Sequence, residues 1–410
     1  MNLSRLKRAV SVRLLRRPDI REITYEEVGD EAVISDYIGD DELGDSSKIE
    51  KGKKYRLLDM IIDWPDSIEK PRVGLTMDHN SRPHWVKYEH FLKKNSIPYE
   101  VFDLRTSDWL DKARKLDLII WSLDSGPWEH EEIKRKISII ENNMGIRSFP
   151  GLHEMMLYDN KLMEVELLRF YGLPVAETFI SHSYKETEET IHRLTYPQVS
   201  KMSKGSTSEE VFLVESPKAA MKIARSSFSR YGRKSHWPCV RQKDYVYFQR
   251  FVEGDKYDLR ILVSSNMITG YFRDCPDRDF RASGGHKVRK TDIPIEAIEI
   301  ALKVFYHLSG SSIAVDMIRN AKGEYKIIEL SQFTWSRTPV RMSVDGHPGF
   351  YLLHKDGKLE FKHGMFWNED EILKAYFEMN YLSSPETWKK ENILPVIEKG
   401  NLYKDLSACK

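Results

Sequence analysis

An antiparallel β-hairpin is predicted by the stretch Ser312-Ile-Ala-Val-Asp-Met-Ile-Arg-Asn-Ala-Lys-Gly-Glu-Tyr-Lys-Ile-Ile-Glu-Leu-Ser331, in which two apolar runs rich in β-branched residues flank a turn sequence. If the turn is Lys322-Gly323, Asp316 lies directly opposite Glu329, with Cβ atoms about 5 Å apart. A four-residue loop instead makes these two carboxylates diagonal neighbours. Either way, a carboxylate at Asp316 interrupts an otherwise apolar strand and needs a physical reason.

A magnesium site is one such reason. Two buried carboxylates this close repel each other unless a cation lies between them. Oxygen ligands suit Mg²⁺, and the hydroxyl of Ser331 shares a strand face with Glu329, so we predict Asp316, Glu329 and Ser331 as metal ligands. The alternative is an ordinary exposed hairpin whose polar side chains face water.

Length and composition indicate a globular chain. Its 410 residues suit two or three domains, and 40% hydrophobic residues can build a core. Lys and Arg total 64 against 63 Asp and Glu, so net charge offers no attraction to nucleic acid, and no nucleic-acid partner is expected. The three cysteines form no CxxC pair, which argues against a zinc or disulfide framework and fits the cytoplasm. No transmembrane segment is expected.

The segment before residue 70 is predicted to be an N-terminal extension, 1–69. Residues 1–17 contain no acid and read as a basic amphipathic helix, which either makes weak contact with an anionic membrane surface or a partner, or packs on its own protein. The acidic, glycine-containing stretch 26–45 reads as a linker.

Residues 70–155 alternate strand and helix patterns, which predicts a small α/β domain built on a parallel sheet. No GxGxxG follows its first strand, so a dinucleotide-binding domain is not predicted. The expected strands are 72–77, 99–104, 116–123 and 146–149, and the expected helices are 85–95, 107–115 and 131–143.

Two lysines, Lys161 and Lys201, lie where they could contact an anion. Lys161 begins a helix, where a cation is disfavoured unless an anion lies beyond it; a merely solvated lysine is the alternative. Lys201 ends a strand that runs into Lys204-Gly205-Ser206-Thr207-Ser208, a loop dense in donors that can fold over phosphates. It is not a Walker loop, and the alternative is an exposed hairpin tip.

A second hairpin is predicted around Ser265-Asn266, which places Asp258 opposite Arg273 and Arg260 opposite Tyr271 on one face. Two arginines on one strand face are costly to bury without an anionic ligand, whereas a solvated face carries them easily. A further arginine, Arg281, precedes a glycine-rich turn.

In this order the motifs resemble the ATP-grasp superfamily, in particular its RimK-like and glutathione-synthetase-like carboxylate-amine ligases. The resemblance runs from Lys161 to Ser331 and also includes Gln249-Arg-Phe-Val-Glu253 and Asp258-Leu-Arg260. It implies an ATP-grasp fold, in which two subdomains grip ATP, at 156–345. The parallel-sheet domain before it would be a pre-ATP-grasp domain, and 346–410 a C-terminal extension.

The resemblance also implies roles for individual residues. Metal ligands would be Asp316 and Glu329, with Ser331 standing where these ligases usually have Asn, and Arg250 occupies a hinge position that is often acidic. Catalytic arginines that hold the phosphoryl group and the intermediate would be Arg260, Arg273 and Arg281. Residues that bind ATP would be Lys161, Lys201, Lys204, Gly205, Ser206, Gln249, Phe251, Val252, Glu253 and Asp258.

The implied activity is that of an ATP- and Mg²⁺-dependent ligase. It would activate a carboxylate, carried by a small molecule, a peptide or a saccharide, as an acylphosphate and join it to an amine acceptor. Two alternatives stay open: a small-molecule kinase on the same scaffold, and a nucleotide-binding module without turnover.

Overall fold

The computed structural model describes residues 28–33, 53–78, 83–122, 126–205, 210–237, 240–277, 279–282, 287–332 and 338–399. The predicted basic helix at 1–17 and the loop residue Ser206 lie outside the described residues. The chain divides into two compact units, one containing Asp66–Pro150 and the other containing Asp30–Pro65 together with the chain from Gly151 onward.

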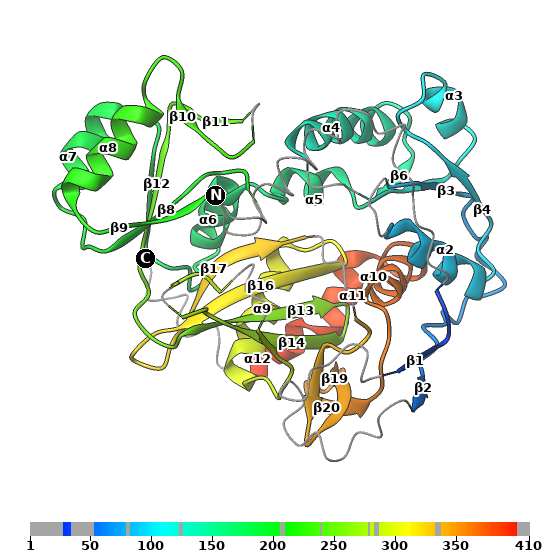
Figure 1. Cartoon of the computed structure of the whole chain (residues 1–410). Coiled ribbons are helices and arrows are strands. Elements are labelled where there is room, and N and C mark those ends of the chain that lie inside the picture. The colour runs from blue at the N-terminus through cyan, green and yellow to red at the C-terminus, as the bar shows by residue number, and fades with distance from the viewer. Residues whose placement is uncertain are drawn as a thin grey trace. The chain divides into compact units, whose positions relative to one another are not determined.

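The first unit confirms the predicted parallel sheet. Its strand order is β4-β3-β5-β6, and every neighbouring pair is parallel (Figure 1). The central strands are fully buried, as the apolar run before Trp121 predicts. The elements are β3 (Val73–Thr76), α2 (Trp85–Lys94), β4 (Tyr99–Phe102), α3 (Trp109–Ala113), β5 (Leu118–Ile120), α4 (Pro127–Asn142) and β6 (Arg147–Phe149). Helix α4 begins earlier than predicted because Pro127 occupies its first turn, where a missing N–H costs nothing.

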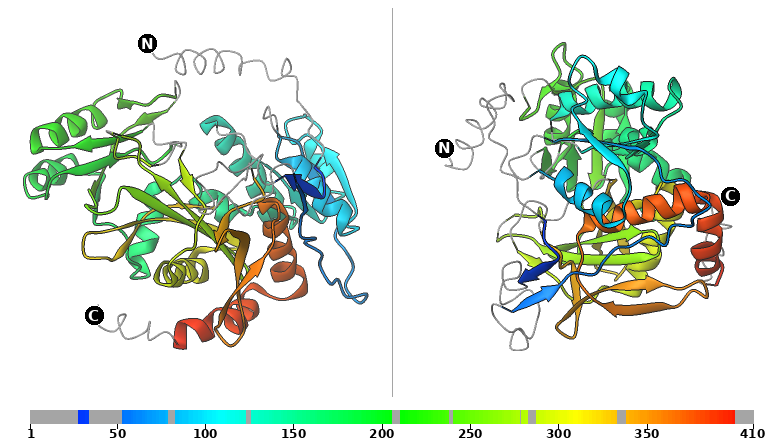
Figure 2. Two further views of the ribbon diagram at one scale, coloured as in Figure 1. Left: turned by 60° about the horizontal axis from the view of Figure 1, so that its bottom comes forward. Right: turned by 90° about the vertical axis from the view of Figure 1, so that its right-hand side faces the viewer.

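The second unit contains a smaller antiparallel sheet, ordered β7-β12-β8-β9. Helices α7 and α8 lie on one face of it (Figures 1 and 2). Their residues Ile191, Ala220 and Ala224 form one core cluster with Val246 and Phe248 of β12. Its elements are α5 (Leu152–Leu157), α6 (Lys161–Phe170), β7 (Thr178–Ser181), α7 (Tyr184–Ile191), β8 (Gln198–Lys201), β9 (Val211–Val214), α8 (Pro217–Ser227), β10 (Arg233–Lys234), β11 (Arg241–Gln242) and β12 (Val246–Arg250).

A larger antiparallel sheet follows, ordered β17-β16-β13-β14-β19-β18, with β15 paired to β14 and β20 to β19. Helix α9 packs on one face, where Leu259, Ile261 and Val315 belong to the main core. The polar residues that alternate with them point to the opposite face, which we call the site face. The elements are β13 (Tyr257–Ser264), β14 (Met267–Asp274), β15 (Val288–Arg289), α9 (Ile295–Leu308), β16 (Ser312–Arg319), β17 (Tyr325–Ser331), β18 (Met342–Val344), β19 (His347–Leu353) and β20 (Leu359–His363).

The C-terminal segment after β20 is helical. Helix α10 contacts β13 and β16 and continues into a π-helix at Glu378–Leu382. The elements are α10 (Asn368–Phe377), α11 (Pro385–Asn392) and α12 (Leu394–Lys399). Strand β1 (Glu31–Val33), which falls in the stretch predicted as a linker, pairs with β2 (Lys54–Arg56). Of the helices described, none is both long and apolar enough to cross a bilayer.

Both predicted hairpin pairings are confirmed, but one turn is wrong. Asp258 pairs with Arg273 across β13 and β14, and Asp316 pairs with Glu329 across β16 and β17. Near the turn, however, Arg319 pairs with Tyr325, so the connection is longer than the predicted Lys322-Gly323 pair. A β-bulge restores the register, because Met317 pairs with Ile327 and Ile328 is the extra residue.

Candidate functional site

A cavity of about 630 Å³ lies between the smaller sheet and the site face of the larger one, a volume typical of small-molecule sites. Ten of the residues predicted from the sequence line it: Lys201, Gln249, Phe251, Val252, Glu253, Asp258, Arg273, Arg281, Asp316 and Glu329. Lys161 and Arg260 lie behind this lining, in contact with Glu329 and Asp316. The structure therefore brings together residues that are more than 100 positions apart in the sequence.

Apolar side chains form two walls of the cavity. Val199 and Leu213 come from the smaller sheet, and Ile318 and Ile328 from the larger one. Leu213 is 40% exposed, which is the expected state of an apolar side chain that faces an open cavity. The sequence analysis missed these residues, because short apolar strands do not reveal which sheet they will face.

Asp316 is held by two guanidinium groups. Arg260 donates from Nε and Nη2 to the two carboxylate oxygens, both at 2.7 Å, and Nη2 of Arg273 lies 2.8 Å from Oδ2. Although burial alone would raise the pKa of Asp316, Arg260 and Arg273 hold it well below its ordinary value. The counter-charge for both arginines is thus Asp316, which lies on β16. For these arginines the sequence analysis had considered an anionic ligand or a solvated face, but not Asp316.

Arg273 also holds Asp258, its partner across the hairpin. Its Nε and Nη2 donate to the two Asp258 oxygens at 2.6 and 2.8 Å. Burial raises the pKa of Asp258 to about 6, against the opposing effect of Arg273. Charges from three adjacent strands therefore form one connected network at the bottom of the cavity.

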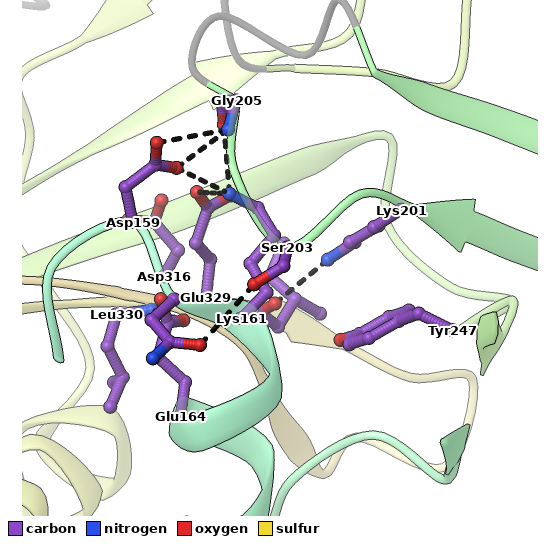
Figure 3. Close-up of polar contacts among 12 residues, drawn as sticks. Asp159, Lys161, Glu164, Lys201, Ser203, Gly205, Tyr247, Asp316, Glu329 and Leu330 are labelled. Atoms are coloured by element: carbon purple, nitrogen blue, oxygen red, sulfur yellow. Dashed lines mark hydrogen bonds and ion pairs between the residues drawn. The ribbon is translucent and has the colours of Figure 1, made fainter. Parts of the chain in front are cut away.

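Lys161 links Glu329 to the start of the predicted phosphate loop (Figure 3). Its Nζ lies 3.2 Å from Oε1 of Glu329 and donates to the carbonyl oxygen of Gly205 at 2.9 Å. The N–H of Gly205 donates in turn to both carboxylate oxygens of Asp159, at 2.8 and 3.1 Å. Burial alone would lower the pKa of Lys161, but the Glu329 and Asp159 carboxylates raise it. The loop that contains Lys204 and Gly205 is thus tied to the N-terminus of α6.

Glu164 is a site residue that the sequence analysis missed. It lies one helical turn after Lys161 and is buried, and its Oε2 accepts the N–H of Leu330 at 2.9 Å. Burial raises its pKa to about 8. The spacing of Lys161 and Glu164 on one helix face was visible in the sequence, but the partner strand β17 was not.

Lys201 reaches across from the smaller sheet to the bulge in β17. Its Nζ donates to the carbonyl oxygen of Ile328 at 2.9 Å, the extra residue of the bulge. Burial lowers the pKa of Lys201, although Glu329 opposes the effect. The β-bulge thus exposes a backbone oxygen that a regular ladder would have used.

The hinge segment after β12 borders the cavity with backbone groups. The N–H of Phe251 donates to Pro197, whereas the N–H of Val252 makes no hydrogen bond with any described residue. Nε2 of Gln249 donates to Tyr247 and Thr178, and the Glu253 side chain is exposed. This segment therefore offers the backbone N–H of Val252 and the carboxylate of Glu253.

Two further predicted residues lie at the margin of the site. Arg281 lines the cavity and donates to Asp279, with Nη2 at 2.8 Å from Oδ2, beside Phe280, which meets Phe251 edge to face. Ser331 pairs with Ala314 on the site face but does not line the cavity.

The donor set fits Mg²⁺ bound together with phosphates. Among the described residues, no group of three or more His, Cys, Asp or Glu is arranged to hold a metal by itself. Mg²⁺, however, is usually held by one or two carboxylates together with substrate phosphates and water. Asp316 and Glu329, adjacent and on one face, supply that minimum.

Comparison with known proteins gives a family for this part of the chain. Residues 158–334 match the model of the RimK-like ATP-grasp domain. The probable alpha-L-glutamate ligase of Haemophilus influenzae strain PittEE is 26% identical over 167 residues, which cover 40% of this chain and 52% of that protein; the protein of strain 86-028NP gives the same values. The chain thus spans about half the length of these curated relatives.

Two solved structures resemble the chain at low sequence identity. The RimK domain ATP-grasp protein of Sphaerobacter thermophilus has a TM-score of 0.45 and 15% identity, over 63% of this chain and 90% of its own. The D-alanine–D-alanine ligase of Bacillus anthracis complexed with ATP has a TM-score of 0.46 and 15% identity, over 64% and 86%. The match to the family model covers residues 158–334, and this part of the chain is similar to the RimK-like ATP-grasp domain.

Proposed function

We propose that this chain is an ATP- and Mg²⁺-dependent ligase that activates a carboxylate as an acylphosphate and joins it to an amine. The observation that carries the proposal is the composition of one cavity. Its apolar walls suit a nucleobase, and its charged groups suit phosphates. Ile318 and Asp316, two residues apart on one strand face, mark the transition between these two parts.

Adenine would lie between the apolar walls contributed by the two sheets. The N–H of Val252 is available as a donor to the base, as described above, and the exposed carboxylate of Glu253 is available to the ribose hydroxyls. Gln249 and Phe251 would shape this end of the site through their packing. This arrangement holds the base through backbone and shape, which is compatible with an arginine at position 250.

The phosphates would lie among the cationic side chains. Lys161, Lys201 and the loop residues Lys204, Gly205 and Ser206 would neutralise them from one side, and Arg260, Arg273 and Arg281 from the other. Asp316 and Glu329, with the hydroxyl of Ser331 nearby, would hold Mg²⁺, which when bound neutralises phosphoryl charge. Asp258 would act by orienting Arg273.

The chemistry follows from the weakness of a carboxylate as an electrophile. Transfer of the γ-phosphoryl group of ATP to the carboxylate gives an acylphosphate and ADP. An amine then attacks the acyl carbon, the C–N bond forms, the C–O bond to phosphate breaks, and inorganic phosphate leaves. The guanidinium of Arg273, fixed by Asp258 and Asp316, would stabilise the oxyanion that develops at the acyl carbon.

Stoichiometry distinguishes the proposal from the two alternatives. The purified chain, with ATP and Mg²⁺, is incubated with a panel of carboxylates and amines, beginning with L-glutamate because the relatives are named for a glutamate ligase. A ligase releases ADP and phosphate in step with a coupled product. A kinase releases ADP and a phosphorylated product without free phosphate, and a binding module releases no ADP.

A double variant, Asp316→Asn with Glu329→Gln, supplies the control. Both changes keep the side-chain volume while removing the charges that would hold Mg²⁺. Calorimetric titration with an ATP analogue should show Mg²⁺-dependent binding to the natural chain and none to the variant. Unchanged binding and turnover by the variant would contradict the metal-ligand assignment.

A further inference from the structure

The smaller sheet and its helices carry a positive charge that the chain as a whole does not show. Residues 178–250 contain 13 Lys and Arg against 7 Asp and Glu, a net charge of +6, so the rest of the chain, whose total is +1, carries −5. Within this region, residues 216–243 contain eight Lys and Arg and no acid. The expectation of no nucleic-acid partner was based on the total charge, which hides this local excess.

Helix α8 presents one row of cations to water. Lys218, Lys222 and Arg225 are four and three residues apart, so they lie on one face of the helix, and all three are exposed. Ala220 and Ala224, on its other side, belong to the core cluster of the smaller sheet. Like charges at this spacing destabilise a helix.

The hairpin of β10 and β11, which packs beside α8 (Figure 1), adds a second pair of cations. Arg233 pairs with Gln242, and Lys234 pairs with Arg241. Nη1 of Arg233 donates to Oε1 of Gln242 at 3.0 Å and to Oγ of Ser200 at 3.1 Å, so this pair faces the smaller sheet. Lys234 and Arg241 therefore point away from it, and both are exposed. Like charges directly opposite each other destabilise a pair of strands.

Together these side chains form what we call the basic surface: Lys218, Lys222, Arg225, Arg230, Lys234 and Arg241, all exposed. None of the six has an acidic group within 4 Å among the residues that the structure describes, whereas Lys243 pairs with Asp244 at 2.7 Å. Helix α7, beside α8, carries the exposed Glu188 and Glu189, and neither of these carboxylates reaches the basic surface. The six cations thus repel one another, and an anionic partner would remove this repulsion.

An exposed aromatic ring lies next to these cations. Tyr231 is 74% exposed, and the guanidinium carbon of Arg230 lies 5.5 Å from the centre of its ring. The next residue, Gly232, has φ +67°, and a Cβ there would lie 2.7 Å from the carbonyl oxygen of Gln242. The turn that presents Tyr231 therefore requires glycine. An exposed ring beside exposed cations is an arrangement on which a nucleobase stacks.

We propose that the basic surface binds single-stranded nucleic acid, with phosphates on the six cations and a base stacked on Tyr231. Phosphate contacts supply most of the affinity of such binding, and stacking adds to it without sequence preference. An anionic membrane is the competing partner, but the apolar side chains of α8 that could enter lipid pack in or against the core instead. The inference is independent of the proposed ligase activity, because the basic surface shares no residue with the cavity lined by Lys201.

Fluorescence anisotropy with labelled oligonucleotides tests the proposal on the full chain. Single-stranded RNA and DNA of about 20 nucleotides, long enough to fill one such site, and a duplex of the same sequence are titrated between ~50 and ~200 mM salt. At least one single strand should bind, and more tightly than the duplex. The logarithm of its affinity should fall linearly with the logarithm of the salt concentration, by about 0.7 for each phosphate contacted.

Two sets of variants separate phosphate binding from stacking. Lys234→Gln with Arg241→Gln should weaken binding by ~10-fold or more and make the salt dependence shallower by about 1.4. Tyr231→Ala should weaken binding by ~10-fold or more with the salt dependence unchanged, and Tyr231→Phe should bind like the natural chain. The matched control, Lys355→Gln with Lys358→Gln, removes two exposed lysines between β19 and β20 and should leave the affinity unchanged.

Several outcomes would overturn the inference. One is that no oligonucleotide binds at the lowest salt concentration, and another is that the control weakens binding as much as the change at Lys234 and Arg241 does. Equal affinity for the duplex, with no effect of Tyr231→Ala, would exclude stacking on a single strand. Binding to vesicles that contain phosphatidylserine but to no oligonucleotide would assign the surface to a membrane. An excess of a non-hydrolysable ATP analogue with Mg²⁺ should not displace the oligonucleotide, and displacement would place the nucleic acid in the cavity lined by Lys201 instead.

Discussion

Two clusters of charge share one face of the larger sheet, and they differ in how their charges are compensated. In the cluster around Asp316, Arg260 and Arg273 both contact Asp316, and Arg273 also contacts Asp258, at 2.6–2.8 Å. In the cluster around Arg341 and Glu371, Nε and Nη2 of Arg341 and both carboxylate oxygens of Glu371 are within 3.5 Å of no well-aligned partner among the described residues. Apart from the half-buried Arg260, the side chains of both clusters are buried, so exposure to water does not account for the difference.

The comparison shows two ways of arranging charged groups on one sheet face. Where the protein supplies the counter-charges itself, side-chain positions are fixed before any ligand arrives, which favours stabilisation of charge that develops during the reaction. Where the protein leaves a buried charge without a partner, the folded chain is less stable. Mutations should therefore affect stability in opposite directions at the two clusters.

The largest effect is expected from Arg273→Met. This change leaves the buried carboxylates of Asp258 and Asp316 short of a cation, so the free energy of unfolding should fall by about 3–5 kcal/mol. Urea unfolding measures it, with Arg225→Met on the exposed side of α8 as the control. A loss no greater than that of the control would show that the network contributes nothing to stability.

The same arginine should affect catalysis more than nucleotide affinity. Under conditions where the variants are folded, Arg273→Ala should lower kcat by ~10²-fold or more, because a donor aimed at developing charge is lost. Arg273→Lys should recover only part of the rate, since it lacks the forked geometry. Nucleotide dissociation constants are measured beside kcat. Weak ATP binding with an intact kcat would move Arg273 into the nucleotide pocket.

A smaller effect is expected in the pH dependence at the second cluster. The ordinary pKa of a Glu side chain is 4.5, and burial raises that of Glu371 to about 8, against the opposing effects of Arg341 and Ser264. The unfolded chain therefore binds fewer protons over this range, and the free energy of unfolding should fall as the pH rises from about 4.5 to 8, by at most about 1.4 kcal/mol per pH unit. Glu371→Gln should flatten this slope in unfolding measured at several pH values. An identical slope in the variant would mean that Glu371 is already ionised.

The smallest expected change in the free energy of unfolding compares the two clusters most directly. Arg341→Met removes a buried cation whose Nε and Nη2 lack partners, so it should raise the free energy of unfolding by about 0.5–1 kcal/mol. Thermal unfolding of the two Met variants side by side checks this. If Arg341→Met destabilises the chain as much as Arg273→Met does, Arg341 has compensation that the contacts do not reveal.

Local patterns explain which predictions succeeded. The alternation of strands and helices predicted the parallel sheet of the first unit, and the turn at Ser265-Asn266 gave the correct pairing of Asp258 with Arg273. The pairing of Asp316 with Glu329 was also correct, but the turn on which it was based was not. A β-bulge changes which backbone groups form hydrogen bonds, and the residue types in a sequence do not indicate where it occurs.

Contacts between distant segments could not be predicted in the same way. Glu164 accepts the N–H of Leu330, 166 positions later, and Arg341 lies over Tyr271; both contacts depend on how strands and helices pack. The domain boundaries and the roles of the ATP-binding residues remain predictions. The predicted roles rest on the order of the motifs in the sequence. The structure adds that most of the residues predicted to bind ATP line one cavity.

The bulge at Ile328 bears on how this hairpin can change during evolution. Losing one residue from a strand normally turns every later side chain to the other face. Loss of Ile328, however, would bring Ile327 and Glu329 next to each other and leave a regular ladder in which Glu329 still faces Asp316. A single-codon deletion at this position would therefore preserve the carboxylate pair while taking away the backbone oxygen that Lys201 uses. Alignments of related hairpins should tolerate a one-residue gap here, and we expect the lysine at position 201 to vary with it.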